Sequence, residues 1–379
     1  MELLEDYRVE IDKIDREITQ LLEKRMNVAK AISKYKMENN MQIFHPDREK
    51  MVIEKNKGYL ENKEYEELVE SFYDNLMYLS RLVQQKEIYP ENKIYTKPYK
   101  NDRENLVVGY QGVAGSFGNE AMLKYFKNIK EAKSYEKFEE VFKAVESGEI
   151  EYGILPVENS STGGIGTVED LLKEYNLYIV GEECIKISQN LVGIKGATVD
   201  DIKEVYSHPQ GFEQSKKFLR NHEDFKLIYF YNTAISAKHV SKLNDKGKAA
   251  IASSRAAKIY NLDILAKNIH DNNNKHTKFV IISKNLESSK ESNKITVSFS
   301  LENRAGSLYN LLGHFVKNNL NMIKIESRPS NGELWEYVLY VDLEGNINDE
   351  KVKNAINLIK EETRYFKLLG CYKKKEGYK

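Results

Sequence analysis

The sequence is short of the residues on which several classes of protein depend. Only two cysteines, Cys184 and Cys371, occur in its 379 residues, so neither a disulfide framework nor a paired-cysteine metal site can form. Lysine plus arginine and aspartate plus glutamate both number 58, and this balance argues against a nucleic-acid binder, whose domains are usually basic. We therefore expect a chain with reduced thiols and no nucleic-acid partner.

Long hydrophobic runs are missing as well. The first residues lack the basic segment and following apolar segment of a signal peptide. No run approaches the ~18 apolar residues of a transmembrane helix. These absences predict a cytoplasmic protein with no membrane segment, and the length is sufficient for two or three domains with cores of their own.

The apolar pattern changes along the chain and predicts three domains of different class. Residues 1–90 hold one glycine and repeat apolar residues at helical spacing, which predicts an all-α domain, and residues 91–104 form a linker. In residues 105–284, eight short apolar runs, predicted to be strands, alternate with helical stretches, which predicts an α/β domain. The polar stretch at 284–293 is predicted to be a second linker, and residues 294–373 after it have the order βαββαβ of an α+β ferredoxin-like module.

The first predicted helix carries cations where apolar residues are expected. Apolar residues recur in steps of three and four from Leu4 to Tyr35, which predicts a helix of ~45 Å. Arg25 occupies a position of this stripe, and Lys36 lies one residue beyond it. A cation in an apolar seam is costly unless an anion meets it. Either Arg25 pairs with a buried glutamate, or Arg25 and Lys36 point at a bound dianion.

A third cation, Arg8, constrains the geometry of such a site. Arg8 precedes Arg25 by 17 residues, or ~25 Å along one helix, so the two cannot hold one small ligand from the same chain. If both serve one site, Arg8 must come from an antiparallel partner helix. The dianion hypothesis therefore predicts a homodimer, with a tetramer left open.

Residues 1–88 resemble the all-helical chorismate mutase domain through Arg8, Leu-Leu-Glu-Lys-Arg25, Lys36, the run His45 to Glu49, and Ser80 with Gln84. The resemblance implies that arginines clamp the substrate carboxylates, that Lys36 and Gln84 contact the ether oxygen, and that Glu49 holds the ring hydroxyl. His45 stands where many members carry aspartate. A Claisen rearrangement requires a folded conformer and positive charge near the breaking bond, without acid, base or metal. The implied site residues are Arg8, Arg25, Lys36, Arg48, Glu49, Ser80 and Gln84.

Polar clusters follow several predicted strands between residues 106 and 283. They are a glycine turn at 111–118, Asn159 with the hydroxyls and glycines up to 164, Ser207-His208-Pro209-Gln210, the run from Ala249 to Ser254, and the stretch from Asn268 to Phe279. Each cluster alone is more typical of a capped turn. Together they predict a polar cleft between two lobes, because open α/β sheets bind ligands at strand ends. The glycine spacing does not match a dinucleotide-binding turn.

These segments together resemble prephenate dehydratase. The resemblance implies that Thr277 is catalytic, and a positioned hydroxyl can donate a hydrogen bond to the departing ring oxygen. His208 is an alternative acid, although a structural role is the simpler interpretation. Lys278 stands where the family usually has arginine, whose planar fork lysine cannot reproduce. The implied substrate-binding residues are Glu158, Asn159, Ser160, Ser207, Gln214 and Lys278.

The last module resembles the ACT domain that is attached to dehydratases. The matching segments are the turn from Asn303 to Leu308 and Ile325-Glu326-Ser327-Arg328-Pro329. The resemblance implies feedback inhibition by phenylalanine bound at a dimer interface. Trp335 on the next predicted strand lies either in the core or beside that pocket. The implied effector residues are Gly306, Ser307, Leu308, Glu326, Ser327 and Arg328.

The sequence thus predicts an enzyme that converts chorismate to prephenate and prephenate to phenylpyruvate, with L-phenylalanine as effector. No cofactor or metal is expected, because no His, Cys and Asp cluster has ligand spacing. Two alternatives stay open. One is a ligand sensor without chemistry, which would have no need of cations in a helical seam. The other is a mutase whose dehydratase is impaired by Lys278.

Overall fold

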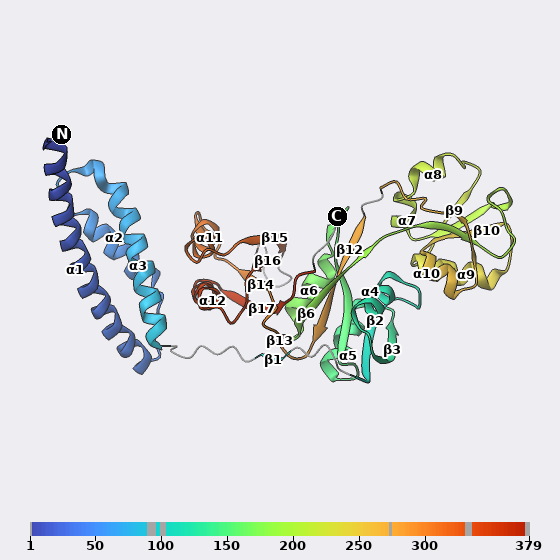
Figure 1. The fold of residues 1–379 in the computed structure, drawn as a ribbon, viewed down its shortest axis with the longest axis horizontal. Helices are drawn as coiled ribbons and strands as arrows, with labels where there is room; N and C mark the ends of the chain where they lie inside the picture. The colour runs from blue at the N-terminus through green and yellow to red at the C-terminus, as the bar shows by residue number, and fades with distance from the viewer. Residues whose placement is uncertain (1, 89–95, 99–103, 273–274, 330–335, 376–379) are drawn as a thin grey trace. The chain divides into compact units, whose positions relative to one another are not determined.

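Figure 1 shows the elements of the structure, a computed structural model. The chain divides into two compact units. The structure describes residues 2–88, 96–98, 104–272, 275–329 and 336–375. The first unit comprises residues 1–94, 301–320 and 348–366, and the second comprises 95–300, 321–347 and 367–379. The break in the N-terminal half falls inside the predicted linker, most of which lies outside the described residues.

The first unit begins with the predicted all-helical segment. The long helix α1 packs against α3 through the buried Ala29 and Ser33. Helix α2 starts at Pro46, a favourable first helical residue, and His45 caps it by accepting a hydrogen bond from the Arg48 backbone N–H at 3.3 Å. The elements are α1 (Glu2–Glu38), α2 (Pro46–Lys57), η1 (Lys63–Tyr65) and α3 (Glu66–Ile88).

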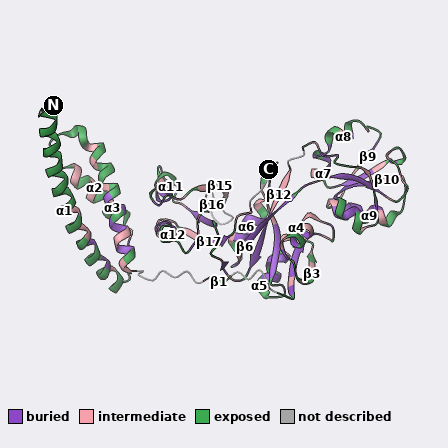
Figure 2. Cartoon of the chain, viewed as in Figure 1, coloured by how far each residue is buried: buried purple, intermediate pink, exposed green. Residues whose placement is uncertain are grey.

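The apolar stripe of α1 faces outward in the single chain. Every side chain from Leu3 to Leu21 is exposed, and the helix is coloured as exposed along this half in Figure 2. Ile11, Ile14 and Ile18 are 56%, 51% and 45% exposed. Because soluble chains rarely leave a continuous apolar stripe in water, this surface is suited to association with another helix.

Helices α11 (Ser307–Lys317) and α12 (Glu350–Glu362) also belong to the first unit. His314 Nε2 and Glu362 Oε2 lie 2.7 Å apart and join the two helices. Along the chain these helices alternate with the strands β14 (Lys294–Ser300), β15 (Met322–Pro329), β16 (Tyr337–Glu344) and β17 (Tyr365–Tyr372) in the predicted order βαββαβ.

The second unit contains a long mixed sheet with the order β15-β16-β14-β17-β6-β12-β4-β2-β3. The β14–β17 module continues the sheet of the preceding lobe, because β17 pairs with β6 at Gly370 and Ile179. A Cβ at Gly370 would collide with the Ile179 backbone, which explains the glycine there. The strands are β2 (Leu106–Gln111), β3 (Ile129–Tyr135), β4 (Tyr152–Asn159), β6 (Tyr178–Lys186), β12 (His276–Ser283), β14 (Lys294–Ser300), β15 (Met322–Pro329), β16 (Tyr337–Glu344) and β17 (Tyr365–Tyr372), with β5 (Gly163–Gly164) beside β4.

The first lobe consists of β2, β3, β4, β5, β6 and β12 together with three helices. These are α4 (Phe117–Tyr125), α5 (Phe138–Ser147) and α6 (Gly166–Glu174). A separate sheet, with the order β11-β7-β10-β8-β9, forms the second lobe. Its strands are β7 (Asn190–Gly193), β8 (Glu204–Ser207), β9 (Lys226–Tyr229), β10 (Lys248–Ala252) and β11 (Asp263–Ala266), and its helices are η2 (Val199–Asp201), α7 (Pro209–Glu213), α8 (Lys216–Arg220), α9 (Thr233–Leu243) and α10 (Ser254–Ile259).

Two segments cross between the lobes, one from β6 to β7 and one from β11 to β12. They are hydrogen-bonded to each other, with Ile187 N donating to Lys275 O at 2.8 Å and Ile269 N to Gln189 O at 2.9 Å. The predicted α/β architecture of two lobes is therefore confirmed, and the eight strands predicted from apolar runs are present.

The polar stretch 284–293 differs from the linker predicted for it. It contains β13 (Glu287–Ser288), which pairs with β1 (Lys97–Pro98). Leu286 and Glu287 are buried, and the Tyr152 hydroxyl donates to Glu287 at 3.0 Å. In the described part of the chain, no helix is long and apolar enough to cross a membrane.

Candidate active sites

The first cation of the helical seam, Arg25, reaches from α1 to α3. Its guanidinium contacts the Ser80 hydroxyl and donates to Leu76 O at 3.4 Å, and Ser80 Oγ itself donates to the same carbonyl at 2.8 Å. Burial lowers the pKa of Arg25, partly opposed by the nearby Tyr73 and Glu49. Among the described residues Arg25 has no ion pair with a carboxylate, so the alternative of a buried glutamate partner is wrong.

Lys36 and Gln84 lie in the same half-buried region. Lys36 Nζ donates to Ile43 O at 2.5 Å, and burial lowers the pKa of its ammonium group. Gln84 Nε2 donates to Ser80 O at 3.3 Å, whereas its Oε1 is buried without a hydrogen-bond partner. Buried polar atoms without partners are rare in folded proteins. The site thus contains two cations, Arg25 and Lys36, without a carboxylate partner, and one acceptor, Gln84 Oε1, without a donor among the described residues.

Glu49 is held by an arginine that the sequence analysis did not single out. Arg81 Nη1 lies 2.5 Å from Glu49 Oε2, and its guanidinium is 5.0 Å from the centre of the Phe44 ring. Arg81 follows Ser80 directly and lies one turn before Gln85. Its helical position could have drawn attention to it, because residues three and four apart share a face.

Two predicted mutase residues do not join this cluster within one chain. Arg8 is exposed and pairs with Glu5 at 3.0 Å, and the helix rise puts it ~25 Å from Arg25. The Arg48 side chain is exposed, and its backbone N–H serves the cap of α2.

The centre of the dehydratase candidate site is a pair of buried side chains from adjacent strands. Asn159 ends β4 and Thr277 lies near the start of β12, and the two residues are partners in the antiparallel register. Asn159 Nδ2 donates to Thr277 Oγ1 at 3.0 Å, and the Ser161 backbone N–H donates to Asn159 Oδ1 at 2.9 Å. These bonds fix the orientation of the amide. Because Thr277 Oγ1 accepts, its own proton remains to be donated.

Ser160 links the end of β4 to the start of β12. Its backbone N–H donates to His276 O at 2.9 Å, and its Oγ accepts from the His276 backbone N–H at 3.0 Å. Ser160 therefore fixes the start of β12 beside Asn159.

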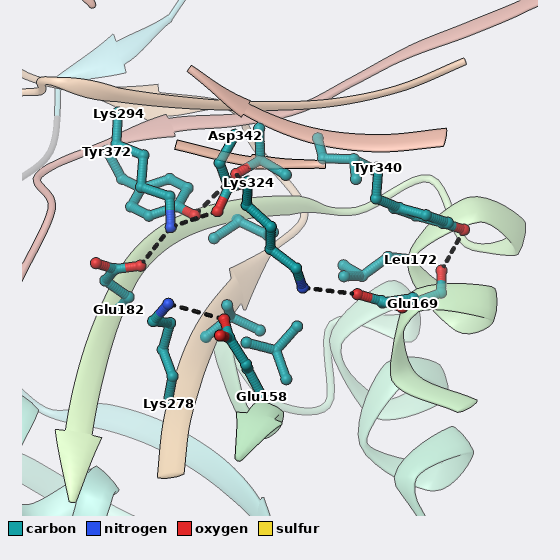
Figure 3. A pocket seen from close by; sticks show the side chains of 15 residues that line it. Glu158, Glu169, Leu172, Glu182, Lys278, Lys294, Lys324, Tyr340, Asp342 and Tyr372 are labelled. Carbon is teal, nitrogen blue, oxygen red and sulfur yellow. Dashed lines mark hydrogen bonds and ion pairs between the residues drawn. The ribbon is translucent and has the colours of Figure 1, made fainter. Parts of the chain in front are cut away.

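Lys278 and Glu158 point the other way. Successive side chains of a strand alternate between faces, so these two residues lie on the sheet face opposite Thr277 and Asn159. Lys278 Nζ lies 2.9 Å from Glu158 Oε2, inside a polar pocket that also includes Glu169 and Lys324 (Figure 3). Burial disfavours ionisation of Glu158, but the hydrogen bond and charge of Lys278 outweigh it and lower the pKa. The structure does not bring this pair together with Thr277.

The remaining predicted residues belong to the second lobe. Ser207 ends β8, is fully buried, and its Oγ has no partner among the described residues. Gln214 Oε1 accepts from Gln189 Nε2 at 3.4 Å, and the Gln189 backbone N–H donates to His270 Nδ1 at 3.3 Å. Gln189 and His270 come from the two crossing segments. The sequence analysis missed Gln189. The feature that could have identified it is its position as a polar residue directly before the strand β7.

His208 caps α7 and is exposed at the end of β8. Its Nδ1 accepts from the Gln210 backbone N–H at 3.1 Å, which requires a neutral ring, and burial lowers its pKa below the ordinary 6.5. The cap is therefore intact above that value and is lost only as the pH falls through the lowered pKa.

We expect His208→Asn to leave dehydratase kcat within about twofold of the parent value, because asparagine is also a good helix cap. The pH profile of prephenate turnover should overlay that of the parent chain. A fall of about 10²–10⁴-fold would instead identify His208 as the proton donor.

The predicted effector residues are divided between the two units. Gly306, in the left-handed region with φ +83°, precedes α11, and Ser307 and Leu308 open that helix in the first unit. Glu326, Ser327 and Arg328 lie on β15 in the second unit. Trp335 lies outside the described residues. Among the described residues, no group of three or more His, Cys, Asp or Glu could hold a metal ion.

Two family models match the parts of the chain that contain the candidate sites. The model of chorismate mutase type II matches residues 7–85, and the prephenate dehydratase model matches residues 108–287.

Full-length relatives and solved structures extend this match. A bifunctional chorismate mutase/prephenate dehydratase of Buchnera aphidicola subsp. Acyrthosiphon pisum is 33% identical over 97% of this chain and 95% of its own. The corresponding protein of Aquifex aeolicus is 33% identical over 99% of each chain. The crystal structure of prephenate dehydratase from Arthrobacter aurescens in complex with L-Phe matches with a TM-score of 0.66 and 25% identity, over 71% of this chain and 90% of that one. This chain therefore belongs to the bifunctional chorismate mutase/prephenate dehydratase family, with both enzyme domains in one polypeptide.

Proposed function

We propose that the α1–α3 cluster is the chorismate mutase site and that Arg25 and Lys36 are its main cationic contacts. The family converts chorismate to prephenate, a rearrangement that proceeds through a compact conformer with charge developing at the breaking C–O bond. Arg25 would bind a carboxylate through its fork, while Lys36 and Gln84 would contact the ether oxygen. The supporting observation is that these two half-buried cations have no carboxylate partner among the described residues. Glu49, Arg48 and Ser80 complete the proposed set.

The proposed mutase site is completed by a second copy of the chain. Arg8 is too far along α1 to reach the Arg25 site of its own chain. The exposed apolar stripe of α1 supports association with an antiparallel α1. In that arrangement the start of one helix lies beside the middle of the other, where Arg8 could meet a carboxylate of chorismate. The proposal includes a homodimer, and pairing of dimers into tetramers stays open.

Thr277 is the proposed proton donor of the dehydratase. The observation that carries this assignment is the fixed amide of Asn159, which leaves the Thr277 proton available for the departing ring hydroxyl. The bond to CO2 breaks and its electron pair aromatises the ring as the C–O bond to the hydroxyl breaks; that oxygen leaves as water with the Thr277 proton, which Thr277 regains from solvent, and phenylpyruvate is the product. Asn159, Ser160, Ser207 and Gln214 would hold prephenate between the lobes.

Lys278 in place of arginine does not argue for an impaired dehydratase. Its side chain pairs with Glu158 on the sheet face opposite Thr277, where a substitution leaves the proposed proton donor untouched. Lys278 and Glu158 would then support the strands rather than contact prephenate, which differs from the role expected from the sequence. The ligand sensor without chemistry is disfavoured by the two enzyme family matches.

The segment 294–373 is proposed to be an ACT domain that makes the dehydratase sensitive to L-phenylalanine. Its βαββαβ order and the L-Phe complex of the Arthrobacter dehydratase support this role. Inhibition would follow if L-phenylalanine binds one arrangement of the domains more tightly than another. The predicted bounds of 1–90 for the mutase and 105–284 for the dehydratase are retained in this proposal.

We expect L-phenylalanine to lower the rate of phenylpyruvate formation from prephenate and to raise the thermal midpoint of the chain. Binding at 100 times the Kd would stabilise the liganded arrangement by about 2.7 kcal/mol. The assay compares L-phenylalanine with L-alanine at equal concentrations. An unchanged rate and midpoint up to millimolar L-phenylalanine would contradict the regulatory proposal.

A further inference from the structure

Strand β15 presents alternate side chains to helix α6 of the first lobe. Arg328 Nη2 lies 3.1 Å from Asp170 Oδ2. Lys324 Nζ lies 3.1 Å from Glu169 Oε1 and 2.7 Å from Glu326 Oε2. The residues between them, including Ser327, are exposed. Two of the predicted effector residues, Glu326 and Arg328, therefore contact the dehydratase lobe itself.

Two glycines of the first lobe explain how closely β15 approaches. A Cβ added to Gly164 would collide with the Glu326 carboxylate, and a Cβ added to Gly166 would collide with the Arg328 guanidinium. Neither glycine has a positive φ, so the backbone conformation does not require glycine at these positions. The side chains of β15 occupy the space that any larger residue would need.

The segment that carries these glycines is an extension of the Asn159 corner. Gly164 pairs with Glu158 and Gly163 with Asn159 in the short β4–β5 hairpin. Ile165 N donates to Val157 O at 2.9 Å, and α6 begins at the next residue. The contacts of Glu326 and Arg328 are thus transmitted to Asn159 through one hydrogen-bonded hairpin.

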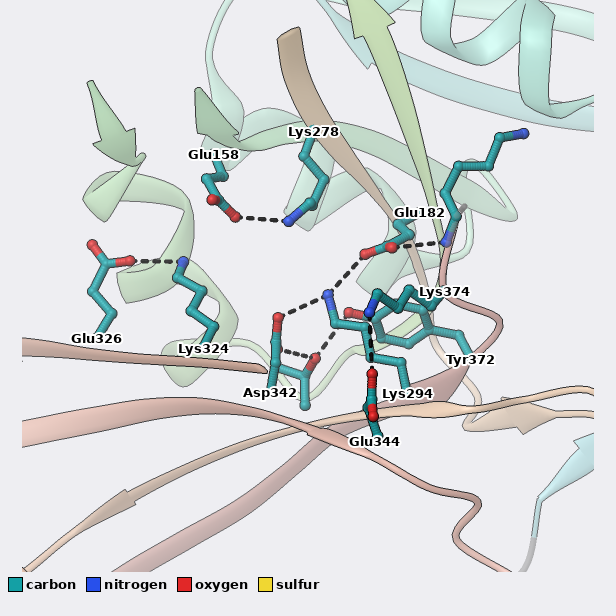
Figure 4. Close-up of polar contacts among 12 residues, drawn as sticks. Glu158, Glu182, Lys278, Lys294, Lys324, Glu326, Asp342, Glu344, Tyr372 and Lys374 are labelled. Carbon is teal, nitrogen blue, oxygen red and sulfur yellow. Dashed lines mark hydrogen bonds and ion pairs between the residues drawn. The ribbon is translucent and has the colours of Figure 1, made fainter. Parts of the chain in front are cut away.

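Charged side chains also join the sheet of the first lobe to the β14–β17 module, on the sheet face opposite Asn159 and Thr277. Lys278 and Glu158 lie beside Lys324, and the buried Lys294 joins Glu182 at 2.8 Å to Asp342 at 2.7 Å (Figure 4). Lys294 is 3% exposed, and breaking a buried ion pair of this kind is strongly destabilising. Strand β6, which pairs with the Thr277 strand β12, is therefore held firmly against the module.

We propose that Glu326 and Arg328 are positioning residues for dehydration, which hold Gly164 of the β4–β5 hairpin and Gly166 at the start of α6 so that Asn159 orients the Thr277 hydroxyl. The inference rests on the proposed assignment of Asn159 and Thr277 to the dehydratase site. It gives β15 a part in prephenate turnover in the absence of effector. A ligand that displaces β15 would lower kcat through the same contacts.

A double-variant cycle on the full chain tests the contact between Gly166 and Arg328. We expect Gly166→Ala and Arg328→Ala each to lower dehydratase kcat by about ten- to a hundredfold, because a displacement of ~1 Å can cost that much. The KM for prephenate should change little, which also shows that the site is still folded. The double variant should be no worse than either single variant, because both remove one contact.

Two further variants separate positioning from a general structural role. Arg328→Lys keeps the charge opposite Asp170 and should recover part of kcat. Gly247→Ala is a matched control, since its added Cβ would come no closer than 3.4 Å to Asp245 Oδ1, and it should leave kcat unchanged.

The possible results separate the positioning role of Glu326 and Arg328 from the assignment of Thr277 to the dehydratase site. Normal kcat in Gly166→Ala and Arg328→Ala, beside an inactive Thr277→Ala, would overturn the positioning proposal alone. Losses that multiply in the double variant, or a change confined to KM, would overturn it as well. An active Thr277→Ala would overturn both the site and the inference.

Discussion

Thr277→Ala should reduce the turnover of prephenate by about 10²–10⁴-fold, the usual worth of a positioned proton donor. The variant removes the only hydroxyl in the Asn159–Thr277 pair and leaves Asn159 Nδ2 without its acceptor. The loss should appear in kcat, because the hydroxyl acts on the leaving oxygen in the transition state. The measurement is the initial rate of phenylpyruvate absorbance from prephenate.

Two controls make this result specific. Thr277→Ser keeps the hydroxyl and should retain most of the activity, apart from a small loss of rotamer definition. The chorismate mutase rate of Thr277→Ala, measured on the same preparation, should be unchanged because the mutase residues belong to the other compact unit. Equal loss of both activities would contradict the assignment of separate sites.

Arg25→Ala should lower chorismate mutase activity and leave prephenate turnover intact, the reverse of Thr277→Ala. Removing one partner of a hydrogen-bonded charge pair costs about 2–5 kcal/mol, so mutase kcat/KM should fall by about thirtyfold to several thousandfold. Prephenate turnover should be unaffected. Lys24→Ala removes the neighbouring exposed cation of α1 and is the matched control, which should retain mutase activity.

The same variant tests whether Arg8 acts across a dimer. Arg8→Ala and Arg25→Ala should each be nearly inactive as mutases when purified alone. Equal co-expression should give heterodimers in about half of the molecules, each with one site that has both arginines, and so about a quarter of the parent activity. If the co-expressed protein is no more active than the single variants, the shared site is wrong.

The fold was largely predictable because the apolar patterns are local. The eight apolar runs of the α/β region are strands, and the helical module forms three α-helices and one short 3-10 helix. Strand β3 was missed because its residues Ile129–Tyr135 are mainly polar at a sheet edge. The stretch around Glu287 was mistaken for a linker because its burial depends on Tyr152, a contact across 135 residues of chain.

The sites were predictable in their residues but less so in their geometry. The register that joins Asn159 to Thr277 links strands that are far apart in sequence. Once that register is known, strand alternation places Lys278 on the sheet face opposite Thr277. From the sequence alone, Lys278 was predicted to bind the substrate. Likewise, the contacts of Glu326 and Arg328 with two glycines depend on tertiary approach, for which the motif residues carry no signal.

The central claim is that one chain has two separate sites and that its dehydratase proton donor is Thr277. The most direct measurement mixes purified Arg25→Ala and Thr277→Ala proteins and supplies chorismate alone. Each variant by itself should form almost no phenylpyruvate, while the mixture should form it at a substantial rate because prephenate made by one protein is dehydrated by the other. A mixture as inactive as its components would contradict the account.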